Sequence, residues 1–153
     1  MPPSAKWSDA ALLGIVRKEY LAAFHAHDAA FGADPKLLET YPLRYNAICC
    51  AALAARGEGA DPGVLTNDEH AALRAMALAW MRAEVATWRA GTLGSKPERS
   101  AAVDNLKSSE TDADLTGVRD EQALQLLPAE EGESWRALWR EIADLITQAE
   151  SKK

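Results

Sequence analysis

The chain has 153 residues, of which 48% are hydrophobic and 26% charged, and its formal net charge is -6. A chain of this length is about one domain that buries a core without disulfides or metals, and its composition excludes a disordered or low-complexity protein. The negative charge, with no basic cluster longer than Arg17-Lys18, argues against nucleic acid as a partner.

The cysteines and the apolar runs indicate a soluble cytoplasmic protein. Cys49 and Cys50 are adjacent in an apolar run, where helical side chains diverge by about 100°, so buried thiols are expected and a disulfide is not. Such thiols suit a reducing cytoplasm. The longest early apolar run, residues 10–16, is far below the roughly 18 residues of a membrane span and is short for a signal sequence. A membrane is therefore not an expected partner.

Helical periodicity dominates the chain, and no useful length of it alternates with period two. This predicts an all-α fold, an antiparallel helix-pair repeat or bundle of about five helices in one domain. Caps, prolines and glycines set the bounds of the elements. In chain order we first expect a helix from Ser8 or Asp9 to about Phe31, a turn over 36–40, and a helix from Pro42 to about Arg56. After a loop over 57–63, a helix is expected from residues 66–68 to Ala90, ending at Gly91. A weaker helix from Pro97 to about Lys107, a helical turn or two through Leu127, and a last helix from Pro128 follow.

Three of these helices carry the pattern of a core. From Ala47 to Ala55 the second helix consists mostly of small residues, which let a neighbouring helix come close. The apolar residues of the third helix span an arc of about 200°, which is wide enough to pack on two sides. The last helix has the cleanest amphipathic spacing, with apolar residues at Trp135, Leu138, Trp139, Ile142, Leu145, Ile146 and Ala149.

The five tryptophans fall into two groups. Trp80, Trp135 and Trp139 stand at helical spacing and are expected in the core. Trp7 and Trp88 lie near chain or helix ends, where a core position and a place in a binding surface are both open.

Glu84 lies near the middle of the apolar arc of the third helix, between Trp80 and Trp88. A buried carboxylate needs a partner, and Arg119 or Arg44 can supply bidentate donors. We expect a structural ion pair of Glu84 and Arg119 that holds the loop at Gly117 onto this helix, rather than a catalytic acid.

The residue pattern gives no catalytic, cofactor-binding or metal site. His25 and His27 point about 200° apart on one helix and cannot bind one metal. A helical-bundle metalloenzyme using His27, His70 and a carboxylate such as Glu69 stays an alternative. A CxxC pair, a phosphate-binding glycine loop, a nucleophile elbow and the kinase motifs are all missing from the sequence. The chain is not expected to be an enzyme or to hold a cofactor.

Several motifs together resemble a known family. They are Arg44 to Ala55, Ala79 to Glu84 with Trp88, Asp112 to Asp120, and Leu127-Pro128 with Trp135 to Trp139. In order and spacing this set is similar to the C-terminal tetratricopeptide-like helical segment of planctomycete-type bacterial serine/threonine protein kinases, over roughly residues 20–150.

The resemblance implies a non-catalytic tail, because the kinase domain of that family has no counterpart here. Trp7, Ala23, Ala30 and Pro35 stand at spacings similar to those of one tetratricopeptide repeat. The segments are then a divergent repeat-like pair over 5–35, the small-residue helix and the long tryptophan-bearing helix over 36–92, a weakly helical connector over 93–127, and the amphipathic helix over 128–150.

These observations favour an interaction or scaffold domain that binds a protein or peptide. Stacked helix pairs leave a concave face that suits peptide segments. The first helix, with Tyr41, Tyr45 and Trp88, is the expected exposed part of that face. A module that caps or assembles a repeat array, without a ligand of its own, is a further alternative, because fewer than three repeats are present.

Overall fold

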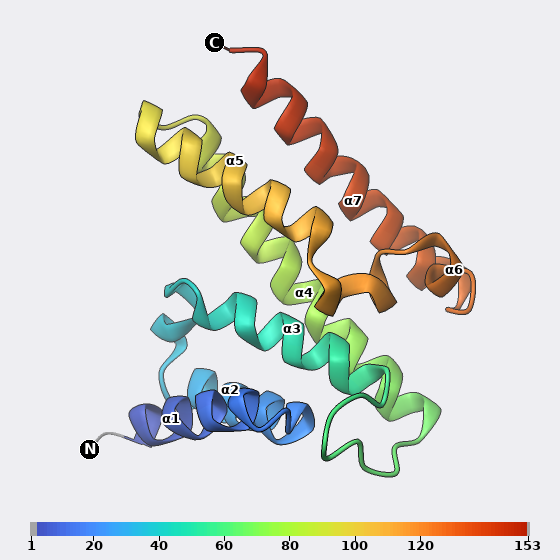
Figure 1. Ribbon diagram of the computed structural model, residues 1–153. Coiled ribbons are helices and arrows are strands. Elements are labelled where there is room, and N and C mark those ends of the chain that lie inside the picture. Colours follow the sequence, from blue (N-terminus) through green and yellow to red (C-terminus); the bar gives the residue numbers. More distant parts are fainter. Residues whose placement is uncertain (1–2, 153) are drawn as a thin grey trace. The chain divides into compact units, whose positions relative to one another are not determined.

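The computed structural model describes residues 3–152, which form seven α-helices and two short 3-10 helices and contain no strand (Figure 1). The all-α class is confirmed, with more helices than the five expected. The chain divides into two compact units, one up to Met81 and one from Arg82. Among these residues no helix is long and apolar enough to cross a membrane.

The first unit begins with a helical hairpin of α1 (Pro3–Val16) and α2 (Tyr20–Ala33). The single helix expected up to Phe31 is therefore wrong, because a turn over residues 17–19 reverses the chain. Lys18 takes a left-handed conformation there, with φ 58°. Gly14 lies at the crossing of the two helices, where an added Cβ would come within 3.0 Å of the Ala23 Cβ.

The short helix η1 (Pro35–Glu39) and the cis Tyr41–Pro42 peptide bond lead into α3 (Leu43–Ala55). This is the expected small-residue helix, and ten of its thirteen residues are buried. Both α1 and α3 pack against α2, so α2 lies between them.

The loop after α3 returns to the start of α2. The Ala60 N–H donates to the Lys18 carbonyl at 2.8 Å. The Asp61 carboxylate accepts a hydrogen bond from the Ala22 N–H at 2.9 Å, whereas Glu19 at the N-cap gives α2 no side-chain cap. A residue 39 positions along the chain thus caps α2.

Helix α4 (Asn67–Thr92) begins with a capping box. The Thr66 Oγ1 accepts from the Glu69 N–H at 3.2 Å, and the Glu69 carboxylate accepts from the Thr66 N–H at 2.6 Å. These hydrogen bonds lower the pKa of Glu69. Gly91 was expected to end this helix but lies within it. Its role is close packing, since an added Cβ would meet the Ala102 Cβ at 2.9 Å.

The second unit continues with α5 (Lys96–Thr111), η2 (Ala113–Val118), α6 (Glu121–Leu124) and α7 (Ala129–Glu150). Helix α5 opens with a capping box of Ser95 and Glu98. Helices α5 and α7 pack together, and Lys107 on the first pairs with Glu150 on the second. The buried residues of this unit are Val85, Leu106, Leu115, Val118, Trp135 and Ile142, among others.

Candidate functional site

Exposed apolar side chains gather on α1. Eight large hydrophobic residues of the described chain are exposed, and four of them lie on this one helix. Their exposed fractions are 43% for Trp7, 47% for Leu12, 48% for Leu13 and 80% for Val16. Only two of the fourteen residues of α1 are buried. A helix that is apolar on most of its circumference is normally covered on most of it, so α1 lacks part of its expected cover.

A groove of about 450 Å³ runs between α1 and α2. Trp7, Ala10, Leu13 and Gly14 line one side of it, and Ala22, His25, Ala26 and Ala29 line the other, with Glu19 at one end. Small residues on α2 make the groove, and Gly14 lets the two backbones approach at one end of it. Its chemistry is apolar, with a single imidazole and a single carboxylate among these residues.

His27 lies on the covered side of α2, with 1% of its surface exposed. Its ring stacks on Phe31 at a centroid distance of 5.8 Å, and its Nε2 atom is buried without a hydrogen-bond partner among the described residues. Burial lowers the pKa of His27 to about 4. The ring is therefore neutral at pH 7 and belongs to the aromatic core, where Phe24 and Phe31 also contact Trp80.

The alternative metal site is not assembled from its expected residues. The Nδ1 atom of His70 lies 2.8 Å from the Ala55 carbonyl oxygen. Among residues 3–152, neither His27 nor His70 belongs to a group of three side chains with metal-ligating atoms close together. A metalloenzyme built on these two histidines therefore has no geometric support.

The residues expected to bind a partner lie in different environments. Tyr41 is exposed and Tyr45 is partly buried. Trp88 is only 4% exposed, so its expected place on an exposed face is wrong. The apolar arc of α4 is wide enough to bury it even near the end of the helix. Whether Tyr41 and Tyr45 contact a partner stays a prediction.

Glu84 is buried, with 3% of its surface exposed, but its expected pairing with Arg119 is not formed within the described chain. The Arg119 Nη1 atom donates to the carbonyls of Asp112 and Ser109, at 2.6 and 3.3 Å, and its Nε atom pairs with Asp120. Its guanidinium also lies over the Trp139 ring. Arg119 thus satisfies carbonyl groups of the turn between α5 and η2, which we call the corner after α5. Arg44, the other cation considered for Glu84, is itself buried.

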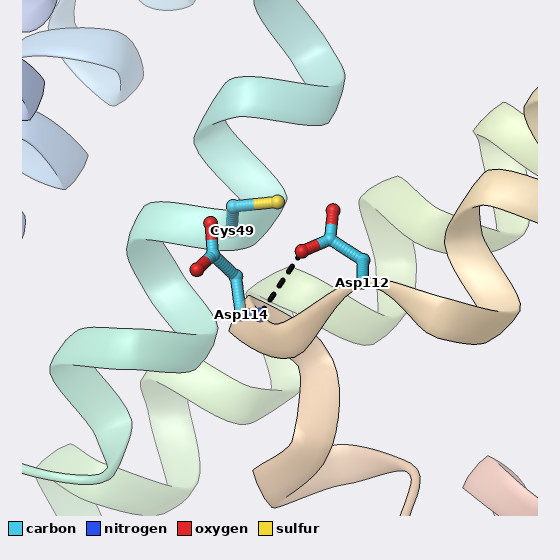
Figure 2. A group of neighbouring side chains, drawn as sticks. All are labelled: Cys49, Asp112 and Asp114. Carbon is cyan, nitrogen blue, oxygen red and sulfur yellow. Dashed lines mark hydrogen bonds between the residues drawn. The ribbon is translucent and has the colours of Figure 1, made fainter.

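The same corner contains two carboxylates that could suggest a cation site. The Asp112 Oδ1 atom accepts a hydrogen bond from the Asp114 N–H at 3.0 Å, the dashed line in Figure 2. Asp112 is the N-cap of η2, so this contact is a local turn. The Cys49 thiol, also drawn in Figure 2, is on α3 and is buried and free of a disulfide, as expected.

The tryptophans expected in the core are largely there. Trp80 and Trp135 are buried, whereas Trp139 is partly exposed and donates its indole N–H to the Val118 carbonyl at 2.8 Å. Trp7, for which the sequence left both positions open, lies on the exposed side of α1. Its neighbours Leu12, Leu13 and Val16 were missed as surface residues. The run from residue 10 to 16 is apolar on all sides of a helix, which predicts that the helix is covered and does not indicate that these side chains are exposed.

Comparison with known proteins gives no relative. No family model matches the chain, and searches of curated proteins and of solved structures find no match either.

Proposed function

We propose that the protein is a non-catalytic helical interaction domain that binds a protein or peptide on α1 and in the groove between α1 and α2. The observation that carries the proposal is the concentration of exposed Trp7, Leu12, Leu13 and Val16 on one helix. Exposed aromatic and aliphatic side chains that are concentrated in one part of a protein surface are typical of interaction sites.

The resemblance of the sequence to the helical tails of bacterial serine/threonine kinases supports the same proposal. Such a tail would work in the cytoplasm beside a kinase catalytic domain, without catalysis of its own. Residues 5–35 form a packed helix pair, which is the unit from which tetratricopeptide-like arrays are built.

The test is retention of proteins from a lysate by the immobilised chain. Leu13→Asp places a carboxylate in the α1 surface, and Leu93→Asp is the matched control because Leu93 is exposed outside the hairpin. Circular dichroism first verifies that both variants keep the helical content of the wild type. We expect Leu13→Asp to lose the proteins that the wild type retains and Leu93→Asp to keep them.

Two outcomes would contradict the proposal. One is a set of retained proteins that is the same for the wild type and for Leu13→Asp. The other is a loss that Leu93→Asp causes to the same degree, because the surface responsible would then lie elsewhere.

A further inference from the structure

Two charged residues, Asp9 on α1 and Arg17 directly after its last residue, stand at equal distances from Leu13. Asp9 precedes Leu13 by four residues and Arg17 follows it by four. At 100° per residue these three side chains fall within an arc of about 80°, so they form one stripe along the helix. The Arg17 N–H donates to the Leu13 carbonyl at 3.1 Å, which keeps Arg17 on the last helical turn.

All three side chains of this stripe are exposed. Among residues 3–152, neither Asp9 nor Arg17 makes an ion pair or a side-chain hydrogen bond. The stripe thus offers one carboxylate, one apolar side chain and one guanidinium in a row. Val16 and Ala10 flank Leu13 on either side, at about 60° around the helix.

A row with opposite charges at equal distances from an apolar centre is complementary to itself when one copy is reversed. If two α1 helices cross antiparallel at Leu13, Asp9 of each copy lies opposite Arg17 of the other, and Val16 lies opposite Ala10. A two-fold axis produces both ion pairs from one surface, as in isologous dimers. A parallel arrangement would instead oppose like charges.

One charged residue of α1 lies outside the paired stripe. Lys6 is the other charged residue of the helix. In the antiparallel register it lies opposite a point beyond Val16 of the second copy, where the turn over residues 17–19 has already reversed the chain, so this register gives it no partner. Because the chain as a whole is acidic and repels its copies, a contact between two copies requires local charge complementarity such as that of Asp9 and Arg17.

We infer that the occupant of the α1 surface is a second copy of this chain, held by an antiparallel contact of the two α1 helices centred on Leu13, with Asp9 and Arg17 paired reciprocally. This inference rests on the proposed function, for which it names the partner. A single short helix on each side makes the interface small, so the dimer is weak and its population depends on concentration.

Charge reversal tests the register. Asp9→Arg alone and Arg17→Asp alone each put like charges opposite each other in the dimer, and we expect each to weaken self-association about tenfold. An equimolar mixture of the two variants restores both pairs in the heterodimer, and the double variant Asp9→Arg/Arg17→Asp restores them in the homodimer. Both should associate about as tightly as the wild type.

The measurement is sedimentation equilibrium of the full chain from about 5 to 500 μM in low salt, where surface charge pairs are least screened. Asp28→Arg is the charge-matched control, because Asp28 is exposed on α2 and is not among the residues that line the groove. We expect it to associate like the wild type. All substituted side chains are exposed, and circular dichroism verifies that each variant is folded.

A wild type that stays monomeric over this range would overturn the inference. So would a mixture of the two single variants that associates no better than either variant alone. If the wild type is monomeric but Leu13→Asp still loses proteins from the lysate, the proposed function stands and the occupant is another protein. If the wild type is monomeric and Leu13→Asp retains what the wild type retains, both proposals fail.

Discussion

Helices α1 and α3 have similar compositions and opposite surroundings. Each is apolar on nearly all sides, with two charged residues in α1 and one in α3. Yet α3 buries ten of its thirteen residues, whereas α1 buries two of its fourteen. Composition therefore indicates that a helix requires cover on all sides, and it leaves open whether the chain itself or a partner supplies that cover.

The largest expected difference between these helices is in their response to truncation. Ile48→Ala on α3 removes a fully buried side chain and should lower the free energy of unfolding by about 2–5 kcal/mol. Leu13→Ala on α1 should lower it by less than about 1 kcal/mol, because nearly half of Leu13 is already exposed.

Guanidinium unfolding followed by circular dichroism measures both effects at a concentration below self-association. Equal losses for the two variants would mean that the chain covers α1 as well as it covers α3, and the contrast between the helices would disappear.

Lowering the pH should reduce the stability of the fold through His27, which lies on the covered side of α2. The pKa of His27 is about 4 in the folded chain because of burial, and near 6.5 when unfolded. Between these values the unfolded state binds more protons, so stability falls as the pH is lowered from 6.5 to 4 and the loss is complete below 4. The shift corresponds to about 3 kcal/mol.

Comparison of variants isolates this contribution from that of the carboxylates. His27→Phe keeps a ring to stack on Phe31 and should lose less stability between pH 6.5 and 4 than the wild type. His25→Phe is the control, because it replaces an exposed imidazole on the same helix. Parallel profiles for His27→Phe and the wild type would show that His27 is not the group that titrates.

Two glycine substitutions, at Gly14 on α1 and at Gly32 on α2, test how closely these two helices pack. Gly14→Ala should destabilise the chain by about 1–2 kcal/mol, because the new Cβ meets Ala23 at 3.0 Å and the two helices must separate. Gly32→Ala has no heavy atom within 4 Å of its new Cβ and should stabilise α2 by about 0.5–1 kcal/mol. Thermal unfolding of both variants gives the signs, and a stabilising Gly14→Ala would contradict the close crossing of α1 and α2.

The last prediction concerns the capping hydrogen bond at the start of α2. Asp61→Ala removes the carboxylate that caps α2 and should cost about 1 kcal/mol. Glu19→Ala is the matched control at the N-cap position, where the side chain makes no capping hydrogen bond. Urea midpoints of the two variants would decide whether the distant residue or the local one holds the start of α2.

Sequence periodicity was sufficient for the fold class and for most helices. The prolines at 42 and 128 and the spacing of Trp135, Leu138 and Ile142 placed α3 and α7 within a few residues. The turn between α1 and α2 was missed because Lys18 has a positive φ without the glycine that usually signals it.

The site was harder to predict than the fold. Gly91 reads as a helix stop, but its function is to admit Ala102, and only the tertiary packing shows this. By charge alone, Glu84 was a reasonable partner for Arg119. The carbonyl groups at the C-terminal end of α5, which have no partner within the helix, are closer to Arg119 in the sequence and accept its hydrogen bonds. The exposed side of α1 depends on which neighbours are missing, and no local pattern records a missing neighbour.

The cap on α2 also bears on the order in which the chain is completed during synthesis. Asp61 follows Ala22 by 39 residues, so both helices of the hairpin and all of α3 leave the ribosome before the carboxylate that closes α2. Until then the first N–H groups of α2 are satisfied by water and the helix frays at that end. The loop after α3 therefore adds its contribution of about 1 kcal/mol to α2 only after all of α3 has been synthesised.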